Sequence, residues 1–285
     1  MPSKCVNCPR RCGEKYFCSK TNQIKINLHQ LHYGEEPPVS GTNGSGTIFF
    51  SNCNLKCIFC QNYKISHLGS GHDVSDMELI NICKELKTLG AHNINFVTPT
   101  PYVDKLIPII KRLKGDGFAL PIVWNCGGYE SVEMIKELKG LVDVYLPDLK
   151  YSDESLAIEY SSAPGYFKNA IEVIKEMRSQ VRDVFNDDET MKSGLIVRHL
   201  VLPLNVANSK GVLKAIAQNI GTQVYISLMS QYYPVYNACN HPKLDRKLKL
   251  SEYDEICEYF HELGFENGFV QDMDAGDPGN TPDFL

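Results

Sequence analysis

The chain has 285 residues, of which 43% are apolar and 22% charged, and its formal net charge at pH 7 is −5. This composition is typical of a folded globular protein, and the negative net charge argues against non-specific nucleic-acid binding, which needs a positive surface. No uncharged run approaches the roughly 20 apolar residues that span a bilayer, and the first residues lack the apolar core of a signal peptide, so we expect a cytoplasmic protein without membrane or nucleic-acid partners.

The predicted elements begin with a cysteine-rich segment over residues 1–40, which we interpret as an N-terminal metal-binding extension. Its four cysteines are separated by two, three and five residues: Cys5, Cys8, Cys12 and Cys18. Because cytoplasmic thiols stay reduced, and because the ligands of one metal often group along a chain, this pattern favours metal ligation over disulfides. Four soft ligands suit a structural zinc ion or a closed iron–sulfur cluster, and both alternatives stay open, with free thiols as a third.

A glycine- and serine-rich stretch at 40–46 leads into a β-rich run at 47–50, which a second cysteine group follows. That group has the spacing C-x3-C-x2-C and consists of Cys53, Cys57 and Cys60. Three thiolates from one loop can hold three irons of a 4Fe–4S cluster and leave the fourth iron without a protein ligand. Zinc is the competing interpretation, but its nearest candidate fourth ligand, His67, lies seven residues further on. An open iron can bind a substrate directly, here S-adenosylmethionine (SAM), whose reductive cleavage releases a 5′-deoxyadenosyl radical.

From residue 75 onward, helical and strand patterns alternate. The first helix is predicted over 75–89, where Ser75 and Glu78 form a capping box and Gly90 follows the end. Short apolar runs predict strands at 94–97, 121–124, 142–146, 194–202, 224–229 and 268–271. Helical patterns lie between them, at about 103–114, 130–138, 152–182, 210–219 and 251–263.

These elements make up about six βα units, a pattern typical of a parallel sheet with helices outside it. Six units are too few for a complete eightfold barrel, so we predict an α/β fold, a partial (β/α)6 TIM-like barrel, over residues 41–272. Polar residues gather where each strand ends, at the rim that carries function in such barrels. Residues 273–285 are predicted to form a flexible tail.

The segment 51–62, Ser-Asn-Cys-Asn-Leu-Lys-Cys-Ile-Phe-Cys-Gln-Asn, resembles the radical SAM superfamily, and more narrowly the group similar to pyruvate formate-lyase activating enzymes. Further motifs extend the likeness along nearly the whole chain, at 5–12, 44–50, 97–100, 145–150 and 198–203. The resemblance implies a radical SAM partial barrel, an oxygen-sensitive 4Fe–4S cluster, SAM as second cofactor, and an electron donor such as flavodoxin or ferredoxin. It also implies hydrogen abstraction from a peptide or protein substrate, with a glycyl-radical enzyme as one candidate.

Two other functions remain open at this point. The same radical could modify a small molecule or a ribosomal peptide, which differs only in what fills the barrel mouth. A protein of another class, a non-catalytic iron–sulfur electron carrier or a zinc-stabilised scaffold, would not need an open iron.

Candidate SAM-binding residues follow the predicted strands. Asp148 and Lys150 lie two apart at a strand end and so face the same side, where they could hold the ribose hydroxyls and the carboxylate of SAM. The alternative for this pair is a simple salt bridge. Thr98 and Thr100 stand where many superfamily members carry a Gly-Gly-Glu that binds the methionine amino group, and their hydroxyls or backbone carbonyls could substitute.

Further candidates lie on the remaining strand ends. Asn125 stands where activating enzymes tend to place an aspartate that helps to bind a cation, and its neutral amide makes a cation site less favourable. Arg198 and His199 occupy adjacent strand positions, so only one can face the lumen; we favour Arg198 for the SAM carboxylate or adenine. Gln231 and Tyr232 could line the adenine pocket.

Four cysteines fall outside the two groups. Cys126 lies at the predicted mouth, where packing is the default role and a radical relay or ligand the alternative. Cys83 and Cys257 fall on apolar helix faces and are expected in the core, while Cys239 is too isolated to mark a site.

Overall fold

The computed structural model of the protein describes residues 4–13, 15–273, 282 and 284. Within these residues the strands form one sheet in the order β10-β9-β8-β6-β5-β4-β2-β1-β3, and β7 pairs with β8 outside this path. The strands are β1 (Ile24–His32), β2 (Ser45–Phe50), β3 (His72–Val74), β4 (Ile94–Val97), β5 (Ile122–Cys126), β6 (Val144–Pro147), β7 (Val184–Phe185), β8 (Met191–Leu200), β9 (Tyr225–Met229) and β10 (Gly268–Val270).

Six neighbouring strands, from β2 to β9, run parallel and follow one another in chain order, and β10 adds a further parallel strand beside β9. This arrangement confirms the predicted parallel sheet built from βα units. Because β3 and β10 are the two ends of the strand order, the sheet is an open, partial barrel.

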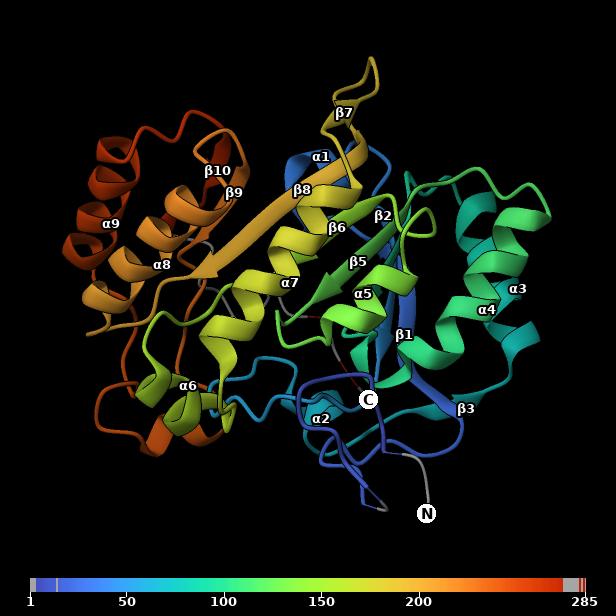
Figure 1. Ribbon diagram of the computed structural model, residues 1–285, viewed down its shortest axis with the longest axis horizontal. Coiled ribbons are helices and arrows are strands. Elements are labelled where there is room, and N and C mark those ends of the chain that lie inside the picture. The colour runs from blue at the N-terminus through green and yellow to red at the C-terminus, as the bar shows by residue number, and fades with distance from the viewer. Residues whose placement is uncertain (1–3, 14, 274–281, 283, 285) are drawn as a thin grey trace.

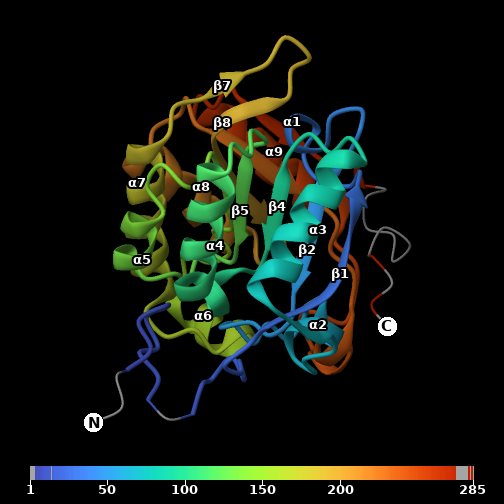
Figure 2. The ribbon, with the colours of Figure 1, turned by 90° about the vertical axis from the view of Figure 1, so that its right-hand side faces the viewer.

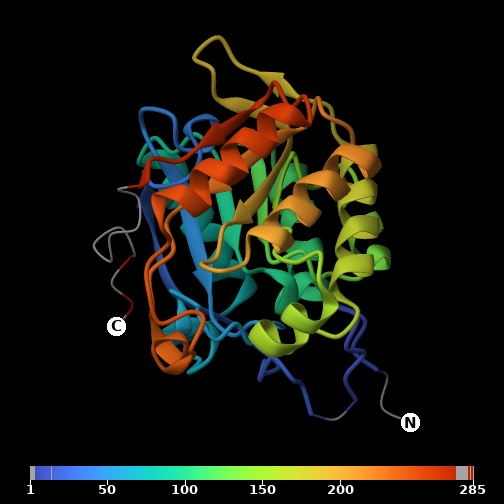
Figure 3. The same ribbon diagram turned by 90° about the vertical axis from the view of Figure 1, so that its left-hand side faces the viewer.

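The longer helices cover the outside of this sheet. In chain order the helices are α1 (Pro37–Ser40), α2 (Tyr63–Ser66), α3 (Asp76–Thr88), α4 (Val103–Gly115), α5 (Val132–Glu137), α6 (Glu154–Ser161), α7 (Tyr166–Gln180), α8 (Val206–Asn219) and α9 (Leu250–Glu262), with 3-10 turns η1 (Thr100–Tyr102) and η2 (Tyr236–Asn240). Figure 1 shows α5 and α7 in front of the sheet, with α8 and α9 on one side and α3 and α4 on the other. Figure 2 views the molecule from the α3 side and Figure 3 from the α9 side.

Local sequence signals explain where several helices begin and end. The Ser75 side chain accepts the Glu78 N–H at the start of α3, and the Glu78 carboxylate accepts the Ser75 N–H in return, which confirms the predicted capping box. The helical stretch expected at 152–182 is divided because Ser162 takes a left-handed conformation (φ 49°) and ends α6. Gly165, also left-handed, then precedes α7.

The antiparallel strands β1 and β3 were not predicted. β1 pairs with β2 along most of its length and with β3 at its beginning. Most side chains of β1 are only half-buried, so the segment lacks the apolar run that marks the parallel strands. The sheet therefore extends into the part of the chain that sequence analysis assigned to the N-terminal extension.

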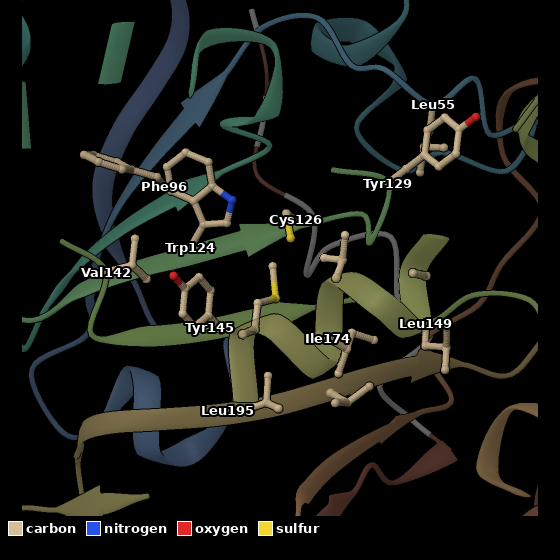
Figure 4. Close-up of a cluster of buried hydrophobic side chains, with 14 of the residues drawn as sticks. Leu55, Phe96, Trp124, Cys126, Tyr129, Val142, Tyr145, Leu149, Ile174 and Leu195 are labelled. Carbon is tan, nitrogen blue, oxygen red and sulfur yellow. The ribbon is translucent and has the colours of Figure 1, made fainter. Parts of the chain in front are cut away.

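The core has two layers, one on each side of the sheet. Between sheet and helices, Phe96, Trp124, Tyr145 and Leu195 are completely buried, and Ile174 of α7 packs onto them (Figure 4). On the other side of the sheet, apolar side chains fill part of the barrel interior. We call this group the lumen floor; it consists of Val39, Val123, Val144, Leu146, Met191 and Ile196. The two layers follow from the alternation of side chains along each strand.

No helix in the described part of the chain is long and apolar enough to cross a membrane. The predicted tail, 273–285, lies outside the described residues apart from 273, 282 and 284; of these, Phe284 is buried and meets the Phe49 ring edge-on at 5.2 Å between centroids.

Candidate functional site

The loop after β2, residues 51–62, carries the three cysteines and is called the triplet loop. Its backbone is fastened to the end of α6, because the Lys56 N–H donates to the Ser161 carbonyl at 3.0 Å. Cys57 is buried, and its sulfur accepts a hydrogen bond from the Ser161 hydroxyl at 2.9 Å. The Cys60 sulfur lies 3.1 Å from the Ser66 hydroxyl. Both sulfurs are thus held by hydroxyls from helices next to the loop.

The third sulfur, that of Cys53, accepts the backbone N–H of Leu55 at 3.4 Å. Burial raises the pKa of all three thiols, that of Cys60 to about 11. Free thiolates are therefore unfavourable in this loop, whereas a bound cation would compensate their negative charge. Among the described residues, no three His, Cys, Asp or Glu side chains converge as ligands of one ion. A 4Fe–4S cluster does not demand that, because each thiolate binds a different iron, and three thiols from one sheltered loop fit it.

Charged and polar side chains also face the barrel interior, next to the lumen floor. We call this group the charged layer; it consists of Glu35, Asn125, Asp148, Lys150 and Arg198. Asp148 accepts from Lys150 Nζ at 2.5 Å and from Arg198 Nε at 2.9 Å. Arg198 also donates to the Asn125 side-chain oxygen at 2.5 Å and lies 3.3 Å from the Glu35 carboxylate. The Asn125 amide in turn donates to Glu35 at 3.3 Å. One connected network therefore crosses the lumen.

Mutual charge keeps Asp148, Lys150 and Arg198 ionised. Burial alone would raise the pKa of Asp148, but Lys150 and Arg198 outweigh it and hold that pKa below its usual value. Burial would lower the pKa of Lys150, but the negative charge of Asp148 raises it instead. Burial raises the pKa of Glu35 although Arg198 opposes the shift. Lys150 thus carries its positive charge between the Asp148 carboxylate and the triplet loop.

The two strand-end threonines differ in what they offer. Thr98 has φ 60°, a genuine outlier for a β-branched residue and the kind of backbone strain that gathers at functional sites. Its N–H donates to the Asn125 carbonyl at 2.9 Å. Thr100 is buried, and its hydroxyl donates to Glu130 at 2.6 Å. Its hydroxyl is therefore already engaged outside the charged layer.

Adjacent residues of β8 point in opposite directions, as predicted. Arg198 faces the lumen, whereas His199 is buried on the helix side, with Nδ1 2.7 Å from the Leu149 carbonyl and Nε2 2.8 Å from the Ser209 hydroxyl. Burial lowers the pKa of His199 to about 4, so the ring is neutral at pH 7. His199 is therefore a core histidine with both ring nitrogens engaged.

The segment after β9 lies beside the triplet loop. The Gln61 side chain donates to the Gln231 carbonyl at 2.8 Å, and the Tyr232 ring meets Phe59 edge-on at 6.2 Å between centroids. The Tyr232 hydroxyl donates to the Leu244 carbonyl in the interior. Tyr232 is thus a packing residue beneath the triplet loop, with its hydroxyl engaged.

The remaining cysteines divide as expected. Cys126 is buried on the helix side of β5, near Trp124 (Figure 4), which confirms packing as its role. Cys83 lies completely buried in the same core, Cys257 is partly buried against it, and Cys239 is exposed.

Sequence reasoning missed Glu35 and Ser161. Glu35 reaches Asn95, Asn125 and Arg198 from a turn that carries no motif, so no local signal marks it. Ser161 lies inside the helical stretch predicted at 152–182, so no local signal marks it, and its contact with Cys57 spans 104 positions.

Comparisons with known proteins indicate the family of this chain. Residues 47–187, which include the triplet loop, match the Radical SAM superfamily. An uncharacterized protein of Methanocaldococcus jannaschii, MJ0674, is 32% identical over 269 residues, which cover 89% of this chain and 73% of that protein.

Solved structures share the fold at low identity. SuiB of Streptococcus suis, bound to its precursor peptide SuiA, superimposes with a TM-score of 0.53 at 12% identity over 77% of this chain and 46% of that chain. Methylornithine synthase (PylB) gives 0.51 at 13% identity over 73% and 59%, and anSMEcpe with bound AdoMet gives 0.52 at 14% over 78% and 61%. The chain therefore spans less than two thirds of each of these three proteins. Because residues 47–187, with the three-cysteine loop that follows β2, match the Radical SAM superfamily, we conclude that the chain belongs to this superfamily.

Proposed function

We propose that Cys53, Cys57 and Cys60 hold a 4Fe–4S cluster and that the enzyme abstracts hydrogen from a peptide or protein substrate, with a glycyl-radical enzyme as one candidate. The observation that supports this most is the position of the triplet loop, at the carboxyl end of β2 and next to the charged layer of the lumen. When bound, cluster and SAM supply one-electron cleavage of the sulfonium and a 5′-deoxyadenosyl radical. An electron donor such as flavodoxin or ferredoxin is part of the proposal.

The residues around the triplet loop influence the reduction potential of the proposed cluster. The Ser161 and Ser66 hydroxyls lie within hydrogen-bond distance of Cys57 and Cys60, and hydrogen bonds to ligand sulfurs are one of the factors that set a cluster's reduction potential. Lys150 adds a positive charge nearby. Both effects favour the reduced state of the site.

The charged layer gives the proposed SAM site its polar groups. Asp148 is the proposed partner of the ribose hydroxyls, and Lys150 and Arg198 are proposed for the carboxylate. All three are already paired with one another, so SAM binding would exchange some of these contacts for new ones. Asn125, Thr98, Thr100, Gln231 and Tyr232 complete the proposed set, with Thr100 and Tyr232 contributing through backbone or ring because their hydroxyls are engaged.

Proteins of the same fold support the substrate class. SuiB is known in complex with the precursor peptide SuiA, and anSMEcpe with bound AdoMet and the Kp18Cys peptide, and these two complexes support a peptide substrate for the proposed enzyme. Methylornithine synthase, of the same fold, keeps a small-molecule substrate as the second candidate. Superfamily membership favours both enzymatic functions over a non-catalytic carrier or scaffold.

The test is anaerobic. Protein with reconstituted cluster is reduced with dithionite and given SAM, and 5′-deoxyadenosine is measured by mass spectrometry. We expect release from wild type and from Cys239→Ala, whose thiol is exposed and isolated, and none from Cys57→Ala. No release from iron-loaded wild type would refute the proposal. Deuterium transfer into 5′-deoxyadenosine from an α-deuterated glycine of a candidate glycyl-radical enzyme would support that substrate; transfer from a small molecule alone would favour the second candidate.

A further inference from the structure

The four N-terminal cysteines surround a single small cavity. Its volume is about 10 Å³, room for about one water molecule. Its cysteine lining consists of Cys5, Cys8, Cys12 and Cys18. Cys8 and Cys18 are buried, and the other two are half-buried. Four cysteines that lie within 14 positions of one another thus line one small cavity.

The backbone of this segment is folded to present the sulfurs. The Cys5 N–H donates to the Cys12 carbonyl at 2.8 Å, which closes the segment into a compact loop. The Phe17 N–H donates to the Cys12 sulfur at 3.5 Å, so a backbone donor also holds one of the four sulfurs.

We propose that Cys5, Cys8, Cys12 and Cys18 bind one zinc ion in a tetrahedral, fully protein-liganded site. Four thiolates are a known set for structural zinc, and the cavity has the size of one ion. A cluster of four irons and four sulfides needs several times that space. No three of the sulfurs yet converge closely enough to hold an ion, so binding draws the loop inward. This site goes beyond the proposed function and does not depend on it.

The position of the site gives it a structural role. Arg10 donates to the Asn54 carbonyl at 2.7 Å and to the Ser162 carbonyl at 2.5 Å. Asn54 lies in the triplet loop next to Cys53, and it also lines the cavity. Figure 1 shows the first described residues at the same end of the sheet as α2 and α6. The zinc site therefore fastens the N-terminal segment onto the triplet loop.

The test measures metal content in the full chain. Protein is produced in medium that contains iron and zinc, purified without oxygen and analysed by mass spectrometry for both metals. We expect about one zinc per chain in wild type and in Cys239→Ser, and less than about a tenth of that in the Cys8→Ser/Cys18→Ser variant. Cys53→Ala/Cys57→Ala/Cys60→Ala should lose iron and keep zinc, which separates this site from the proposed cluster.

A conservative variant guards against loss of folding. Cys5→His keeps four zinc ligands of the Cys3His kind, so it should retain zinc, and cobalt-loaded wild type should show the visible absorption of tetrahedral thiolate coordination. Wild type without zinc would overturn the proposal. A Cys8→Ser/Cys18→Ser variant that loses about four irons instead of zinc would overturn it as well, because the site would then hold a second cluster.

Discussion

Replacing Asp148 by asparagine keeps the shape of the side chain and removes its charge. The carboxylate accepts from Lys150 at 2.5 Å and from Arg198 at 2.9 Å, and the side chains of these three residues are only 13%, 17% and 15% exposed. Removing one partner of a buried ion pair costs about 3–5 kcal/mol, because the other charge is left without compensation. Arg198 keeps its contact with Glu35 at 3.3 Å, so we expect the lower end, about 3 kcal/mol.

The same change should weaken SAM binding and leave the cluster in place. Loss of one charge-assisted hydrogen bond costs about 1.5–3 kcal/mol, which is a roughly 10- to 150-fold higher Kd. Urea unfolding gives the stability, calorimetry the Kd, and metal analysis the iron content. Glu255→Gln is the matched control, since it breaks an exposed ion pair with Lys210. The reasoning fails if Asp148→Asn is no more destabilising than this control and binds SAM as tightly as wild type.

Three further changes test other parts of the structure. The pKa of His199 is about 4 when folded and about 6.5 when unfolded, so the stability that its neutral ring contributes is fully present above pH 6.5 and is lost toward pH 4. The free energy of unfolding, measured with urea, should therefore fall by about 2 kcal/mol between pH 7 and 5. The His199→Gln variant should show a smaller fall, and His72→Gln, at an exposed site, should show the same fall as wild type. Ser161→Ala removes the hydrogen bond to Cys57 and should make the cluster's reduction potential more negative in a redox titration; an unchanged potential would count against that bond. Ile174→Ala opens a cavity in the helix-side core and should cost about 2–5 kcal/mol by urea unfolding, and a cost below about 1 kcal/mol would mean that the core is not packed as described.

Features with a local cause could be predicted from sequence. The strand at 94–97 has the bounds that its apolar run predicts, because each of its residues is buried in a parallel sheet. The start of α3 was predicted because Ser75 and Glu78 lie within one turn. The opposite orientation of Arg198 and His199 follows from alternation along a strand.

Features made by long-range contacts could not be predicted. The Glu35 carboxylate meets Arg198 across 163 positions, and only closure of the barrel brings them together. β1 was missed because half-buried polar residues interrupt its pattern, and its pairing with β2 is what makes it a strand. The engagement of Thr100 by Glu130 depends on how the turn after β5 packs against η1, which no spacing indicates.

The central claim is that one iron at the triplet loop has no protein ligand and binds SAM. Electron paramagnetic resonance of the reduced cluster, recorded without oxygen in the presence and absence of saturating SAM, tests it most directly. We predict that the g-values of the wild-type signal change when SAM is added, that Cys239→Ala behaves in the same way, and that Cys57→Ala gives no such signal. A fully iron-loaded wild type whose spectrum is identical with and without SAM would contradict the claim.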